Sequence, residues 1–391
     1  MAWELASFPA DLMPADLEAE GAEVEIVRPG EPVRVTHVLD AVEPRIRPDG
    51  RAAFPTEGKA GEGRTNRLDG VVVLSCLDFA QEERPLHEQE SIVDLAGPGA
   101  PYTPFAGETC VVLTFRPGAG GNEEAETFAR RTTLALAEEL ARPTLDAEPA
   151  TVETFALRDA ARLPRVAALI QLSDLGPLYY QYVYGRPAGE AGLPRIVDPA
   201  EVLDGAVTCG ECHWAAMRNP TVFFQRNSLV RSLYREHGER LDFGAVVLMR
   251  GYEQSAEDKQ RAADAAAERA RELEADGVII TTDAGGNSHT DVMLTCRACE
   301  EAGIKTTVIL AEETDPESTR PILTDWVPEA DSIVSTGNVE ELVEAWTPEH
   351  VLGGDLLLDG RPAQEAGAVP VRNYLGAANQ MGQLTLGARA E

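Results

Sequence analysis

The chain has 391 residues, 43% of them hydrophobic, and this length favours two compact units with ordinary globular cores. Its 34 basic and 66 acidic residues give a formal net charge of −32, which excludes nucleic acids and anionic membranes as expected partners. No apolar run approaches the roughly 20 residues that span a bilayer. The first residues also lack the basic and apolar pattern of a secretory leader, so we expect a cytoplasmic protein.

The first half of the sequence predicts an irregular α/β arrangement. Buried strands are expected at 68–79, 108–118 and 164–173, because each has an apolar, β-branched centre. Glycines and prolines crowd residues 94–106, which must therefore form turns. Apolar residues at helical spacing predict an amphipathic helix over 123–142.

The second half alternates strands and helices more regularly. Ser255 and Asp258 form a capping-box pattern at the start of one helix, residues 284–303 lead into a second, and 339–346 predict a third. Apolar strands are expected between them, at 243–252, 276–283, 304–313 and 330–338. This alternation predicts an α/β fold whose C-terminal domain is a doubly wound, mainly parallel sheet.

The loop after the strand at 276–283 lies where open α/β sheets bind their ligands. Gly285 and Gly286 allow a ligand to approach the backbone, and the helix that follows offers free N–H groups to an anion. Further donors follow at Asn287, Ser288 and His289. The pattern is neither a dinucleotide fingerprint nor a phosphate-binding loop, so it favours a small carboxylate over a nucleotide. A tight turn without a ligand explains the same residues equally well.

Two Cys-x-x-Cys pairs raise the question of a metal site. Structural zinc ribbons separate their pairs by roughly 15–20 residues, whereas here the whole segment 213–295 lies between them. Cys296 and Cys299 also share an apolar helical face, which favours buried core thiols. We therefore expect no metal.

Cys209 and Cys212, with His213 next to them, admit several interpretations. The Cys-x-x-Cys-His pattern is typical of c-type haem attachment, which the absence of a leader pattern opposes. A redox dithiol and two ordinary loop thiols are alternatives. In an exposed, strained turn, a cysteine thiolate can instead attack the preceding carbonyl to form a thioester. Elimination and hydrolysis then cut the chain and leave a pyruvoyl group at the new chain end.

Six segments, in order along nearly the whole chain, resemble the component B proprotein of glycine, sarcosine and betaine reductases, a family related to the D-proline reductase proprotein. The segments are VLDAVEPRIRPDG, GRTNRLDGVVVLS, DLAGPGAPYTPFA, YVYGRPAGEAGLPRIVDPAEVLDGAVTCGEC, LVRSLYREHG and RNYLGAANQMG.

This resemblance implies self-cleavage between Glu211 and Cys212, with Cys212 becoming the pyruvoyl group. The products are residues 1–211, an irregular α/β region, and 212–391, the parallel α/β region. The family residue before the cysteine is typically Asn or Thr, so Glu211 departs from the pattern and Thr208-Cys209 offers a competing site. His213 is the candidate base.

The resemblance further implies reductive C–N cleavage of a small amino acid or its N-methylated analogue. The pyruvoyl carbonyl would form an imine with the substrate amine. A selenocysteine or cysteine of a partner subunit would attack the α-carbon, and a thioredoxin-like system would supply electrons. No nucleotide is expected. The alternative is an unprocessed α/β binding or scaffold subunit.

Overall fold

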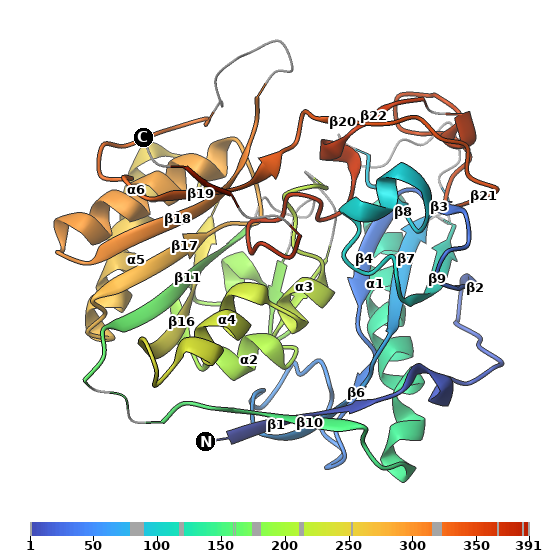
Figure 1. Ribbon diagram of the computed structural model, residues 1–391, viewed down its shortest axis with the longest axis horizontal. Helices are drawn as coiled ribbons and strands as arrows, with labels where there is room; N and C mark the ends of the chain where they lie inside the picture. The colour runs from blue at the N-terminus through green and yellow to red at the C-terminus, as the bar shows by residue number, and fades with distance from the viewer. Residues whose placement is uncertain are drawn as a thin grey trace.

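The computed structural model contains two groups of strands, the N-terminal group with helix α1 and a larger sheet beside it (Figure 1). It describes residues 2–78, 90–116, 121–158, 160, 162–173, 181–210, 215–251, 253–314, 323–365, 367–384 and 387–389. In this part of the chain, no helix is both long and apolar enough to cross a membrane.

The larger sheet has seven strands, of which the five central ones are parallel and the two at the edges antiparallel to their neighbours. Across the sheet they run in the order β14 (Arg195–Val197), β16 (Asp242–Gly251), β11 (Arg165–Ser173), β17 (Gly277–Thr281), β18 (Lys305–Glu312), β19 (Ile333–Asn338) and β23 (Gly387–Arg389). The chain adds β16 on one side of β11 and β17 on the other, so the direction of strand addition reverses at β11.

Helices cover both faces of this sheet. On one face, α5 (Ala256–Glu272) and α6 (Asn287–Glu301) bury alanines and thiols, Cys296 and Cys299 among them. The other face packs against α2 (Pro199–Leu203) and α4 (Ser228–Glu236). The α/β class is thus confirmed, as are the cap at Ser255, which accepts the N–H of Asp258 at 3.0 Å, and the buried state of the two thiols.

The N-terminal group contains two four-stranded sheets. One runs β2 (Ala22–Val27), β9 (Thr109–Phe115), β7 (Val71–Leu77) and β4 (Val38–Val42). Helix α1 (Gly121–Leu140) covers one of its faces, and α3 (Thr221–Gln225) reaches the other through Val222 and Phe223. The second sheet runs β10 (Thr151–Ala156), β1 (Ala2–Phe8), β6 (Gly63–Leu68) and β5 (Arg45–Ile46).

Short elements connect these sheets. The remaining strands are β3 (Val33–Val35), β8 (Val93–Asp94), β12 (Gln181–Val183), β13 (Arg186–Pro187), β15 (Val207–Cys209), β20 (Leu342–Val343), β21 (His350–Leu352) and β22 (Val369–Pro370). The 3-10 turns are η1 (Ala10–Leu12), η2 (Gly97–Tyr102), η3 (Arg142–Asp146), η4 (Ala188–Glu190), η5 (Ala363–Glu365) and η6 (Val371–Asn373). The turns predicted within 94–106 are confirmed by η2.

The helix predicted over 339–346 is wrong. Residues 342–343 form strand β20, which pairs with β22, and the carbonyl groups of Val339 and Glu341 accept the N–H groups of Arg372 and Val371. Val339 and Val343 have the i, i+4 spacing of a helix, but both are buried in the core that these pairings build. Tertiary pairing therefore overrides the local pattern.

Segments from both sides of residue 211 share the same sheets. Strands β11 and β14 precede this residue, yet they lie in the sheet built by β16 to β19. Conversely, β21 from the C-terminal region pairs in parallel with β3. The division into 1–211 and 212–391 stays a prediction, and the two parts are interleaved in space (Figure 1).

Gly376 tests how tightly the C-terminal segment is held against α3. Its φ is +71°, and a Cβ there would lie 2.1 Å from the Phe223 ring, whereas Gly360 has φ +84° and no atom within 4 Å of such a Cβ. We expect Gly376→Ala to lower the free energy of unfolding by about 2–5 kcal/mol, from backbone strain and overpacking together. Gly360→Ala should cost only the strain, about 1–2 kcal/mol. Urea denaturation of both variants measures the difference, and equal losses would contradict it.

Candidate active site

Cys209 ends strand β15 and is fully buried. It pairs with Gln181 of β12, and its N–H donates to Thr221 Oγ1 at 2.8 Å. The prediction of an exposed turn is therefore wrong for Cys209, because β15 is a regular strand whose backbone is hydrogen-bonded to its neighbours. The other three residues predicted for this motif, Glu211, Cys212 and His213, lie outside the described residues.

Arg218 contacts the sulfur of Cys209. Its Nε and Nη2 atoms donate to Cys209 Sγ at 3.3 and 3.1 Å, and the side chain is only 5% exposed. A guanidinium group beside a sulfur favours the thiolate over the thiol. Sequence reasoning missed Arg218, since its approach to the sulfur depends on how the chain turns between β15 and α3.

A hydrogen-bonded relay links this site to the N-terminal sheet. The N–H and Oγ1 of Thr221 donate to the Asp40 carboxylate at 2.8 and 2.6 Å. Burial raises the pKa of Asp40 to about 6, although these hydrogen bonds and the charge of Arg218 act in the opposite direction. Asp40 belongs to β4, so the N-terminal sheet helps to position the backbone of Cys209.

Asp283, at the end of a strand of the larger sheet, lies within reach of the charge of Arg218. It follows β17 and accepts a hydrogen bond from Ser173 Oγ, at the end of β11, at 2.7 Å. Burial raises the pKa of Asp283 to about 6, while Ser173 and the charge of Arg218 lower it. These are the carboxyl ends of β11 and β17, where strand addition reverses and where open α/β sheets bind ligands.

The predicted loop at 285–289 reaches the same region. A Cβ on Gly285 would lie 2.5 Å from Met217 Cε, so the loop packs against the residue next to Arg218. The N–H of Gly286 donates to Glu313 Oε1 at 3.0 Å. A carboxylate of the protein itself therefore lies where we predicted a ligand carboxylate, and burial raises the pKa of Glu313.

The donors predicted in this loop differ in their surroundings. Asn287 Nδ2 donates to the Glu253 carbonyl at 3.4 Å, and Ser288 Oγ donates to the Gly285 carbonyl at 3.0 Å. His289 is fully buried, and burial lowers its pKa to about 4, so the imidazole is neutral at pH 7.

Two buried amides have no hydrogen-bond partner for either of their side-chain polar atoms within the described structure. They are Asn219, next to Arg218, and Gln171, two residues before Ser173 on β11. Leaving a buried polar group unsatisfied costs about 1–3 kcal/mol, so such groups mark places where a polar ligand or water binds.

The comparisons with known proteins show the family of this chain. The family model of glycine/sarcosine/betaine reductase component B subunits matches residues 10–372. The chain belongs to this family.

Relatives of this family match most of the chain. It is 33% identical to the sarcosine reductase complex component B subunit alpha of Peptoclostridium acidaminophilum, over 84% of this chain and 78% of the relative. It is 31% identical to the glycine reductase complex component B subunits alpha and beta of Acetoanaerobium sticklandii, over 87% and 80%. The D-proline reductase proprotein PrdA of the latter organism is 22% identical over 69% and 44%. No solved structure shows a significant match.

Within this member of the family, the described residues hold no group of three or more His, Cys, Asp or Glu side chains arranged to bind a metal ion. Burial raises the pKa of Cys296 to about 11 and that of Cys299 to about 12, so both remain thiols at neutral pH. Cys209, with its guanidinium contact, has a different environment from these core thiols.

The raised pKa of Asp283 predicts a pH-dependent stability. The folded protein holds this proton up to about pH 6 and the unfolded chain only up to about 3.8, so the contribution of Asp283 is complete below pH 3.8 and is lost as the pH rises through 6. The stability of the wild type relative to Asp283→Asn should fall by about 2 kcal/mol between pH 4 and pH 7. Urea denaturation across this range measures it. The exposed Asp146→Asn serves as the control, and parallel profiles for Asp283→Asn and the wild type would refute the assignment.

Proposed function

We propose that this chain is a self-processing α/β-subunit precursor that acts in a glycine-, sarcosine- or betaine-reductase type complex. Its reaction is the reductive C–N cleavage of a small amino acid or N-methylated amino acid. The observation that carries the proposal is the contact of Arg218 with Cys209, beside the carboxyl ends of β11 and β17, in a chain of this family. The strand order also supports a doubly wound sheet, whose ligands bind at this reversal point.

We assign the cleavage to Cys212 and a retained thiolate to Cys209. An N-to-S shift at Cys209 requires distortion of the Thr208–Cys209 peptide, but both residues lie in regular pairing with β12. Arg218 also stabilises the negative charge of this sulfur. His213 stays the candidate base and Glu211 the residue before the cut. The glycine reductase relative, whose name covers subunits alpha and beta, supports a chain that becomes two.

The residues around Arg218 fit a small carbonyl group and its substrate. The amide of Asn219, next to Arg218 in the chain, is a buried donor and acceptor that lacks partners within the described structure, and Arg218 adds a positive charge. A pyruvoyl group supplies a carbonyl electrophile for a substrate amine. The chain offers the polar surroundings that such a reaction needs without a metal or a nucleotide.

The N-terminus of α6 is our proposed position for the substrate carboxylate, with Gly285, Gly286, Asn287, Ser288 and His289 around it. Glu313 is the intramolecular carboxylate that the substrate displaces from the Gly286 N–H. Neutral His289 adds a hydrogen-bonding group without adding charge. The nucleophile comes from a selenocysteine- or cysteine-containing partner subunit, and a thioredoxin-like system supplies electrons.

Intact-mass measurement tests the processing. We expect the purified wild type to contain two chains, 1–211 and 212–391, the second with a pyruvoyl N-terminus. Cys212→Ala should leave one chain of 42.1 kDa. Cys209→Ala should still be cut, and the core variant Cys299→Ala serves as the control. A wild type that stays uncut would support the alternative, an unprocessed binding or scaffold subunit. The presence of Glu211, where the family typically has Asn or Thr, favours that alternative. Cleavage lost only in Cys209→Ala reverses the assignment of the two cysteines.

The two products should elute together in size-exclusion chromatography without denaturant. Strand β11 of the first product pairs with β16 and β17 of the second, so separating them requires breaking the centre of the sheet. Spontaneous separation under native conditions would contradict the interleaved fold.

Substrate affinity tests the α6 position. In the reconstituted complex, Asn287→Ala should raise KM about tenfold, as expected for a lost hydrogen bond to a charged group, and should leave self-cleavage complete. Gln260→Ala, on the exposed side of α5, should change neither quantity. An unchanged KM for Asn287→Ala removes the loop from the substrate site, even if the processing is confirmed.

A further inference from the structure

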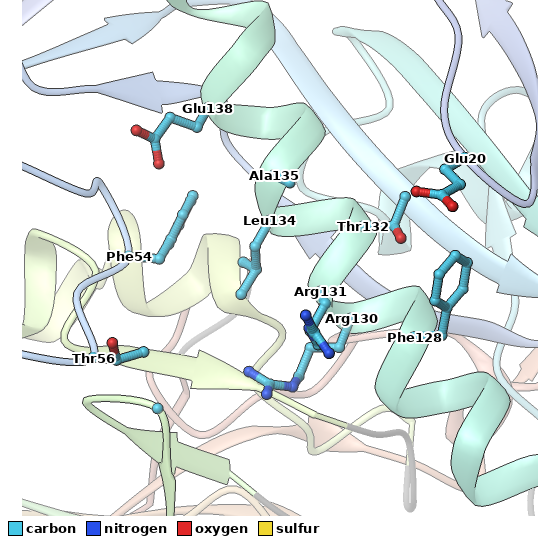
Figure 2. Close-up of a pocket in the computed structure, with 11 residues that line it drawn as sticks. Glu20, Phe54, Thr56, Phe128, Arg130, Arg131, Thr132, Leu134, Ala135 and Glu138 are labelled. Carbon is cyan, nitrogen blue, oxygen red and sulfur yellow. The ribbon is translucent and has the colours of Figure 1, made fainter.

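A cavity lies against helix α1. None of the residues that line it is among those proposed above for processing or for binding the substrate carboxylate. Its volume is about 600 Å³, a size typical of small-molecule sites. Phe54 and Leu134 supply apolar walls, and Arg130 and Arg131 supply two positive charges (Figure 2).

The two arginines of this cavity have no carboxylate partner among the described residues. Arg142, just after the end of α1, shows the ordinary alternative, because its Nε atom pairs with Glu139 Oε2 at 2.8 Å. The charges of Arg130 and Arg131 are therefore not neutralised by a carboxylate within the described structure.

Arg130 is held in place by an aromatic ring. Its guanidinium carbon lies 3.8 Å from the centroid of the Tyr182 ring, a cation–π contact that fixes the side chain. Its Nε is buried and has no hydrogen-bond partner within the described structure. Because the ring covers one face of the guanidinium group, its N–H edges stay available to a ligand.

We propose that this cavity binds a small organic anion, with its carboxylate or phosphate group at Arg130 and Arg131 and its apolar body against Phe54 and Leu134. Two guanidinium groups provide the forked donors that such groups prefer. The apolar walls add the burial that an inorganic ion cannot use.

Two carboxylates on the cavity wall limit the charge of the ligand. Glu138 accepts the N–H of Ala53 at 3.4 Å, and Glu20 lines the cavity as well (Figure 2). Both repel a ligand with many negative charges. The site therefore selects a compact anion over a polyanion.

Calorimetric titration of the full chain at low ionic strength tests the proposal, with phenyl phosphate, benzoate and the neutral benzyl alcohol as probes. We expect both anions to bind and benzyl alcohol to bind at least about tenfold more weakly. Arg130→Gln and Arg131→Gln should each weaken anion binding about tenfold, whereas Arg142→Gln should not. Thermal melts check that each variant is folded.

Three results would overturn the proposal: no binding of either anion, equal binding of benzyl alcohol, or unchanged binding by both arginine variants. Inorganic phosphate that binds as tightly as phenyl phosphate would remove the role of the apolar wall and overturn it as well. If no probe binds but the arginine variants lose a partner subunit, the cavity is a protein-docking surface instead. Self-cleavage is read separately by mass, so failure here leaves the processing proposal standing.

Discussion

One buried positive charge lies where the two groups of strands in this molecule meet. Arg218 contacts the sulfur of Cys209, and its charge acts on Asp40 from the N-terminal sheet and on Asp283 from the larger sheet. A buried guanidinium group is costly to desolvate unless charged or polar partners surround it. The two sheets must therefore come together correctly for this charge to be accommodated.

Arg218 alone cannot neutralise every group around it. Two carboxyls and a sulfur can each carry a negative charge, and burial raises the pKa of both carboxyls to about 6. Both carboxyls therefore change protonation closer to neutral pH than an ordinary aspartate does.

The acidic surface gives local cations a particular importance. With a net charge of −32, the chain repels small anions at long range, and a site for one must supply its own positive charge. Arg218 carries such a charge in the interior, and Arg130 and Arg131 carry two at the cavity beside α1. Strand β12 connects the two regions, since it pairs with β15, which carries Cys209, and it also carries the Tyr182 ring under Arg130.

The local sequence determined most of the secondary structure, because apolar periodicity and the Ser255 cap depend only on near neighbours. It also indicated the family through motifs spread along the chain, and it singled out Cys209 and the loop at 285–289. Tertiary structure decided the rest. Residues 342–343 became a strand because they pair with residues 369–370, and Cys209 became buried because β12 pairs with β15. Arg218, Asp40 and Asp283 are far apart in sequence, and only the packing of two sheets brings their charges together, since electrostatic contacts depend on distance in space and carry no periodic signal in the chain.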